Sequence, residues 1–238
     1  MASPYNPAQT GNYEFALKLA KNLSESEDGS DQKTNLFFSP ASISLVLAMC
    51  QYGADGQTKR QMEEKIFGPD SKGEEISRWI IETLKLELES KKSQVYVLKF
   101  ANRIYANANL SLKTTFVDEI VQIFKSTALN VDFGKNGDKT ADEINAWVEE
   151  VTNHRIKDLV PKGLLNAETS TLLVDEKGTE AAAASFAKMV PQCLFISNEG
   201  PKVFTADHPF LFILKAGGYE HEATILFLGE FYGRDRQS

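Results

Sequence analysis

Residues 35–43 read Asn-Leu-Phe-Phe-Ser-Pro-Ala-Ser-Ile, and this stretch decides how the chain folds. Its three consecutive apolar residues predict a short buried strand. Ser39 is a favoured N-cap, and Pro40 suits the first helical position, where its missing N–H leaves no hydrogen bond unmade. Four apolar residues then recur at helical spacing and give the new helix a buried face: Ile43, Val46, Leu47 and Cys50. The stretch therefore predicts a strand that leads directly into a helix.

Helical patterns dominate the rest of the first 160 residues. Apolar residues recur at helical spacing in four further segments: 7–24, 58–67, 74–89 and 113–126. Thr140 and Glu143 match a capping box, so we expect another helix to begin at Thr140. Pro161 and Gly163 are expected to end it.

Strand patterns are fewer before residue 175 and predominate near the C-terminus. Residues 94–106, 128–133 and 170–174 are rich in β-branched and aromatic residues, as are 210–214 and 223–231. Helices and strands are therefore segregated along the chain, which predicts an α+β fold.

Composition excludes several functional classes. The 238 residues carry 26 Lys and Arg against 33 Asp and Glu, a net charge of −7 that disfavours a nucleic-acid partner. The longest apolar runs are far shorter than the roughly 20 residues of a membrane span, so no membrane partner is expected. The N-terminus has no signal-peptide pattern, and there are two cysteines. Both features predict a cytoplasmic protein, with release by an unconventional route as the alternative.

Motifs for catalysis and cofactors are lacking. The three histidines are scattered and pair with no cysteine at ligand spacing, so we expect no metal site. The sequence holds no phosphate-binding glycine loop and no Gly-x-Ser-x-Gly elbow. We therefore expect neither an enzyme nor a bound cofactor.

Residues 175–185, Asp-Glu-Lys-Gly-Thr-Glu-Ala-Ala-Ala-Ala-Ser, allow two interpretations. Their alanines favour a helical linker, because alanine is the best helix former. As a strand, the segment would place only small side chains on one face: Thr179, Ala181, Ala183 and Ser185. Such a face could enter a crowded sheet without clashes, while Glu180 on the other face stayed in water.

Seven segments, in this order, resemble the serpins of the type without a signal peptide. They correspond to the second helix with its preceding strand, the turn after it, a strand of sheet A, the sixth helix, the reactive-loop hinge, the C-terminal signature and the last strand: 35–43, 53–58, 101–105, 144–148, 176–184, 204–212 and 224–231. The resemblance implies a serpin-like fold, in which helices A–F pack on sheet A and the C-terminal strands belong to sheets B and C. It also implies inhibition of a serine protease by a suicide-substrate mechanism.

The resemblance also implies site residues. The hinge comprises Glu176, Gly178, Thr179, Glu180, Ala181, Ala182, Ala183 and Ala184. The shutter, under the sheet that receives the loop, comprises Asn35, Ser39 and Ser42.

Counting from Glu176 places the cleaved bond at Gln192–Cys193, with Met189 or Leu194 as alternatives. These neighbours imply a target serine protease, or a cysteine protease, with elastase-like or chymotrypsin-like specificity. After cleavage the loop would insert into sheet A as a new strand, driven by a metastable native state.

The chain departs from the family pattern after Val174, which is followed directly by Asp175. About 130–140 residues expected between them are absent, including the histidine partner of the shutter and most of two strands of sheet A. We expect one serpin-like domain, 1–238, made of an N-terminal part (1–174), a hinge and reactive loop (175–203) and C-terminal strands (204–238).

Two functions stay open at this point: a protease inhibitor, or a truncated serpin that acts as a substrate, binds a partner or self-associates through exposed sheet edges.

Overall fold

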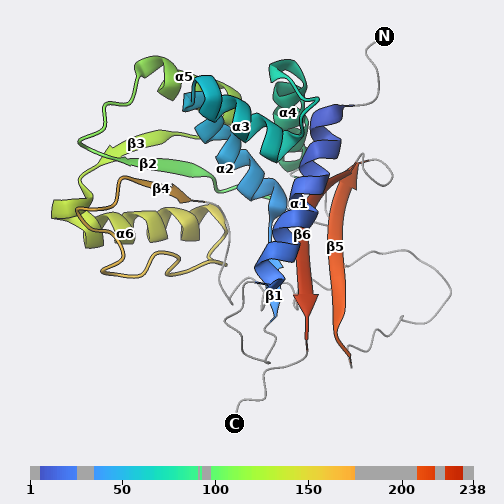
Figure 1. Cartoon of the computed structure of the whole chain (residues 1–238). Helices are drawn as coiled ribbons and strands as arrows, with labels where there is room; N and C mark the ends of the chain where they lie inside the picture. Colours follow the sequence, from blue (N-terminus) through green and yellow to red (C-terminus); the bar gives the residue numbers. More distant parts are fainter. Residues whose placement is uncertain are drawn as a thin grey trace.

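The computed structural model describes residues 6–25, 35–90, 92, 98–174, 208–217 and 223–232. The helices are α1 (Pro7–Glu25), α2 (Pro40–Gly53), α3 (Gly56–Phe67), α4 (Gly73–Ser90), α5 (Thr114–Phe124) and α6 (Phe133–Val151). The strands are β1 (Leu36–Phe38), β2 (Arg103–Asn107), β3 (Ala128–Val131), β4 (Thr171–Val174), β5 (Phe210–Gly217) and β6 (Ala223–Phe231). Figure 1 shows two separate sheets with helices packed against both.

The first sheet has the strand order β3-β2-β4. β2 runs parallel to β3 and antiparallel to β4. Side chains alternate between its faces. Tyr105 and Val174 pack on one side against Ile144 and Val148 of α6. The opposite side contributes Ile104 and Ala128 to a larger core with α2 and α5. The sheet is therefore covered by helices on both faces.

The second sheet has the order β1-β6-β5 and is antiparallel throughout. Its central strand β6 is almost entirely buried, because α1 covers one side and the start of α2 the other. Ala16 and Ala20 of α1 contact Ile225 and Leu228 of β6, and small side chains let the helix approach closely.

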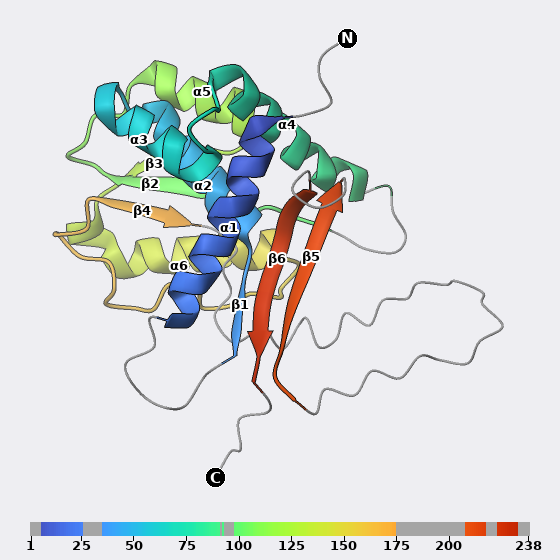
Figure 2. The ribbon, with the colours of Figure 1, turned by 45° about the vertical axis from the view of Figure 1, so that its right-hand side comes forward.

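Helix α2 connects the two sheets. Leu45 and Met49 share a core with Ile104 of the first sheet, whereas Ala41 contacts Leu226 of the second. Figure 2 shows α2 between the strands of the two sheets. The stretch 35–43 therefore supplies both an edge strand of one sheet and the helix that holds the sheets together.

One predicted helix boundary is wrong. Helix α6 begins at Phe133, where Asp132 Oδ1 accepts a hydrogen bond from Lys135 N at 3.0 Å. Thr140 lies inside the helix and is buried. The backbone leaves helical geometry at Asn136 (φ −126°, ψ 24°), so the capping-box pattern falls just after a kink within the helix.

Two further boundaries also differ from prediction. The last helical residue is Val151, well before Pro161. The predicted strand 94–106 is shorter: β2 covers only 103–107, residues 98–102 are not in a strand, and residues 93–97 lie outside the described part.

The predicted α+β class is confirmed. β5 extends to Gly217, three residues beyond the prediction. Among the helices described, none combines the length and hydropathy that a membrane crossing requires.

Candidate functional site: the serine cluster beside the end of β4

The first part of the site is the N-terminus of α2. Ser39 has extended backbone geometry (φ −107°, ψ 98°), and its Oγ accepts a hydrogen bond from Ser42 N at 3.2 Å. Its carbonyl oxygen accepts from Ile43 N at 3.1 Å. The predicted N-cap is therefore present, and it is buried.

Ser42 extends this cap to the first sheet. Its Oγ donates to Oδ1 of Asn102 at 2.6 Å. Both side chains are buried, and Ser126 Oγ donates to the Asn102 carbonyl oxygen. A buried hydrogen-bonded pair of this kind fixes one helix relative to one strand, because breaking it would leave polar groups without partners away from water.

Asn35, the third predicted shutter residue, acts at a different place. Its Oδ1 accepts a hydrogen bond from Tyr232 N at 2.7 Å, at the end of β6. The structure thus brings Ser39 and Ser42 together with Asn102, whereas this bond of Asn35 connects the start of β1 to the end of β6.

Ser39 and Ser42, with their partner Asn102, form what we call the serine cluster, and this cluster lies beside the C-terminal end of β4. Arg103 pairs with Val174, the last residue of β4. Asn102 precedes Arg103 directly, so the hydrogen bond from Ser42 ends one residue beyond the last described pair of β2 and β4. Ser39, Ser42 and Asn102 therefore lie in the same region of the molecule as Val174, the last residue of β4.

β4 is an outer strand of its sheet in the described structure. Asn107 N donates to Ser170 O at 2.8 Å, so Ser170 turns its backbone groups towards β2. By alternation, Thr171 and Leu173 direct theirs away from the sheet, and both residues are exposed. The resemblance noted in the sequence predicts that further strands would continue the sheet at this edge.

Arg103, on the central strand β2 opposite Val174, packs against α6. Its guanidinium lies over the Trp147 ring, with Cζ 3.8 Å from the ring centroid, and Nη1 donates to Tyr105 Oη at 3.2 Å. Its Nε is buried and has no hydrogen-bond partner in the structure. The stacking on Trp147 replaces part of the lost solvation of this cation.

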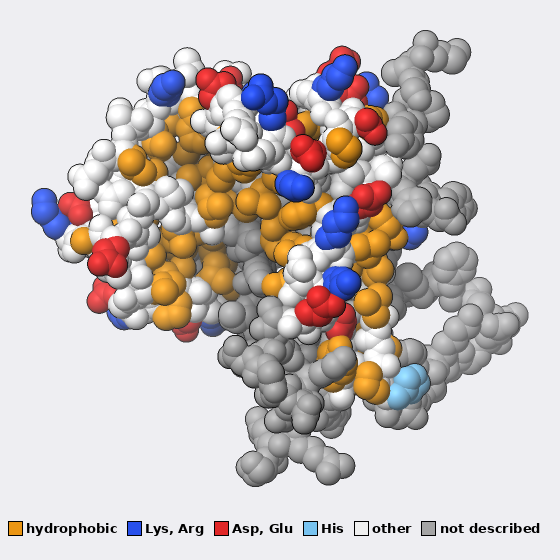
Figure 3. All heavy atoms as spheres, viewed as in Figure 1, with side chains coloured by type: hydrophobic (Ala, Val, Ile, Leu, Met, Phe, Trp, Pro, Cys, Tyr) orange, Lys and Arg blue, Asp and Glu red, His pale blue; other side chains and the backbone are white. Residues whose placement is uncertain are grey.

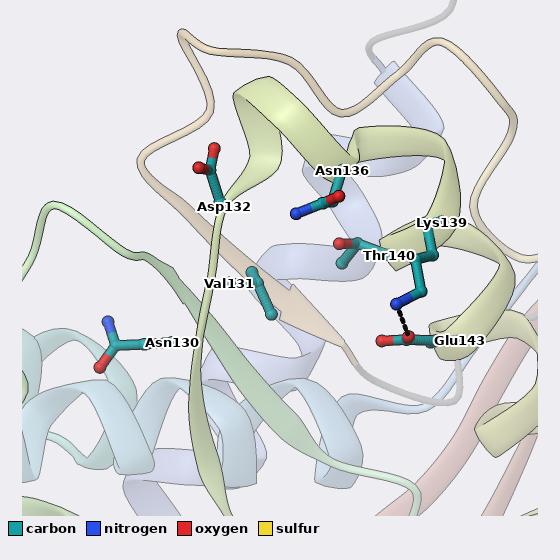
Figure 4. A pocket seen from close by; sticks show the side chains of 7 residues that line it. All are labelled: Asn130, Val131, Asp132, Asn136, Lys139, Thr140 and Glu143. Atoms are coloured by element: carbon teal, nitrogen blue, oxygen red, sulfur yellow. Dashed lines mark ion pairs between the residues drawn. The ribbon is translucent and has the colours of Figure 1, made fainter.

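A polar pocket of about 220 Å³ lies where β3 leads into α6. Figure 4 shows Asn136 and Thr140 pointing from α6 towards β3. Lys139 and Glu143 form an ion pair at 3.6 Å. The remaining lining residues are Asn130, Val131 and Asp132. The pocket is separate from the serine cluster, and its charged groups already interact with neighbours.

Cys50, on α2, is a poor nucleophile. Desolvation by burial raises the pKa of its thiol to about 11. The thiolate is the reactive form of cysteine, so Cys50 does not provide covalent chemistry at neutral pH.

The hinge residues 176–184 and the predicted cleaved bond Gln192–Cys193 lie outside the described residues. Asn102 is the site residue that the sequence reasoning missed. It stands in the segment 101–105, within the predicted strand 94–106; its side chain is buried in the structure, and a buried amide must find a hydrogen-bond partner.

A family model described as "Serpin (serine protease inhibitor)" matches residues 10–175 and 168–233. The chain therefore belongs to the serpin family. The two matched segments meet at residues 168–175, where the sequence predicts the internal deletion. At the level of the family, the chain is related to protease inhibitors.

Individual relatives and solved structures support the same family assignment. The chain is 36% identical over 162 residues to Ipis-1 of Ixodes persulcatus, covering 68% of this chain and 41% of that protein. It resembles the structure of cleaved serpin 42Da with a TM-score of 0.55 at 32% identity, covering 73% of this chain and 44% of the other. The native stressed conformation of Arabidopsis AtSerpin1 has the same fold, with a TM-score of 0.64 at 23% identity, covering 74% of this chain and 43% of that one. The chain thus spans about two fifths of the length of the curated relatives it matches.

Proposed function

We propose that this chain offers proteases a substrate-like loop but does not trap them, and that it self-associates through sheet edges. Its targets are serine proteases of elastase-like or chymotrypsin-like specificity, which cleave at or near Gln192–Cys193. The observation that carries the proposal is the short outer strand β4, which has four residues and pairs with β2 alone among the described strands.

Trapping of a protease depends on the slot in the sheet that receives the cleaved loop. Inhibition of the serpin type requires a loop that inserts between two strands and pairs on both sides. β4 supplies one wall of such a slot over four residues, and the sequence lacks the segment expected to supply the other. A loop paired on one side only gains fewer hydrogen bonds and buries less apolar surface, so less free energy is available to distort a protease.

A trapping inhibitor is the second candidate, and one observation favours it. The hydrogen bonds that join Ser42 to Ser39 and to Asn102 support it, because they order part of the region expected under the receiving sheet. If a second strand were supplied from elsewhere, insertion would become feasible.

Incubation with an elastase-like and a chymotrypsin-like protease separates the two candidates. We expect cleaved chain and active protease, with no adduct that survives denaturing electrophoresis. Mass spectrometry of the fragments should locate the cut between residues 189 and 195. A stable adduct at near-equimolar stoichiometry would instead support the inhibitor.

A pair of hinge variants provides the matched control. Ala181→Arg places a charge on the face of small residues, which would enter the sheet, whereas Glu180→Arg changes the opposite face. We expect both variants to be cleaved like the parent chain. Loss of an adduct in Ala181→Arg alone would show that insertion occurs.

A further inference from the structure

The outer edge of β5 is the longest strand edge in the described part of the chain. β5 has eight residues, whereas the other outer strands, β1, β3 and β4, have three or four. A long apolar edge strand presents a row of backbone groups to which another strand can pair.

Backbone alternation shows which β5 residues face outward. Tyr232 N donates towards β1, to Asn35 Oδ1. Successive residues of a strand direct their N–H and C=O groups to opposite sides, so the β6 residue three positions before Tyr232 directs its groups towards the other neighbour, β5. This residue is Gly229, and it pairs with Phe212. The β5 residues of the opposite phase direct their N–H and C=O groups away from the sheet: Leu211, Ile213 and Lys215.

The side chains on this edge are largely apolar and accessible. Leu211 is 55% exposed, Ile213 38% and Leu214 45%. Figure 3 shows hydrophobic side chains at the right of the molecule, where Figure 1 shows β5 in the same view. Lys215 is exposed and is the one charged residue of β5.

We propose that a second copy of this chain pairs with β5 antiparallel, about a twofold axis through Ile213; this inference rests on the self-association proposed above. In this register Ile213 faces the partner subunit's Ile213, and Leu211 faces the partner subunit's Lys215. The two strands overlap over almost their full length, and every outward backbone group of the three residues gains a partner.

Charge complementarity selects this register. Glu230 of β6 pairs with Leu211, so both side chains lie on the same face. The partner subunit's Lys215 therefore lies across Leu211 from Glu230, within reach of its carboxylate. A twofold axis at Lys215 instead of Ile213 would place the two Lys215 side chains opposite each other, and this repulsion of like charges is unfavourable.

The association closes on itself. The same patch is used by both copies, and such an isologous contact produces a dimer rather than a fibre. We therefore expect a dimer in equilibrium with monomer, and no larger species from this edge.

Sedimentation velocity over a roughly hundredfold concentration range tests the edge. Ile213→Lys places like charges opposite each other at the axis and should yield monomer. Leu173→Lys is the matched control, because Leu173 is 37% exposed on the outer strand β4; it should leave the dimer intact. A dimer that survives Ile213→Lys, or that is lost in Leu173→Lys, would overturn the assignment to β5.

A charge exchange tests the register. Lys215→Glu and Leu211→Lys should each weaken the dimer about tenfold, because symmetry makes every altered pair occur twice. The double variant restores opposite charges across the axis and should return the dissociation constant to about the parent value. No rescue would overturn the register. Circular dichroism of each variant verifies folding, and a parent chain that is monomeric throughout would refute the self-association itself.

Discussion

Ser42 Oγ lies 2.6 Å from Oδ1 of Asn102, a hydrogen bond that joins the first turn of α2 to the residue before β2. Both side chains are buried, so the pair has no access to competing water. The bond fixes the helix that lies between the two sheets to the strand at the centre of one of them. It thus connects α2 to the part of the sheet that lies beside the end of β4.

A double-mutant cycle measures this contact. We expect Ser42→Ala to destabilise the chain by about 1–3 kcal/mol, because it leaves the Asn102 carbonyl oxygen Oδ1 buried without its donor. Asn102→Ala should cost a similar amount, and the double variant clearly less than the sum. Unfolding in urea provides the three free energies. Strictly additive losses would show that the two side chains do not act together.

The strand and helix that carry Ser42 could be predicted from sequence, because the residues that specify them are neighbours in the chain. The strand and helix at 35–43 follow from an apolar run, one N-cap serine, one proline and an apolar stripe, all between residues 36 and 50. The partner of Ser42 could not be predicted in this way, because Asn102 is 60 residues distant and carries no local signal of its contact.

The start of α6 shows a second limit of prediction from sequence. Thr140 and Glu143 match a capping box, but Asp132 also suits an N-cap and lies at the end of β3. The close packing of Gly137 against Leu165 accompanies the extra turns before Thr140: a Cβ on Gly137 would lie 2.1 Å from Leu165 O. Tertiary packing of this kind is invisible to a pattern of four residues.

Gly229 at the centre of the second sheet should tolerate no side chain. A Cβ there would lie 2.3 Å from Phe212 Cζ and 2.6 Å from Leu36 O, so both neighbouring strands would have to move. We expect Gly229→Ala to destabilise the chain by at least about 1–3 kcal/mol. Gly73→Ala is the control, because nothing lies within 4 Å of its Cβ position. Thermal unfolding should separate the two variants, and equal midpoints would contradict the packing described.

Cys50 should resist thiol reagents while the chain is folded. With a pKa of about 11, roughly one thiol in a thousand is ionised near pH 8. The variant Cys193→Ser leaves Cys50 as the one thiol in the sequence. We expect Ellman's reagent to react with it only after denaturant is added. Complete reaction of the native variant at the rate of a free thiol would show that α2 is accessible or opens readily.

Trp147 should stabilise the chain through Arg103 as well as through its own packing. The guanidinium carbon lies 3.8 Å from the ring centroid, and Nε has no hydrogen-bond partner, so the ring shares the stabilisation of this partly buried cation with Tyr105 Oη, which accepts from Nη1. We expect Trp147→Leu to cost about 1–2 kcal/mol more in the parent than in an Arg103→Met background, where no cation remains to be solvated. Trp147→Phe, which retains an aromatic face, should lose less than Trp147→Leu in the parent. Urea unfolding of the variants measures the difference, and an identical cost of Trp147→Leu in both backgrounds would mean that the ring contributes by packing alone.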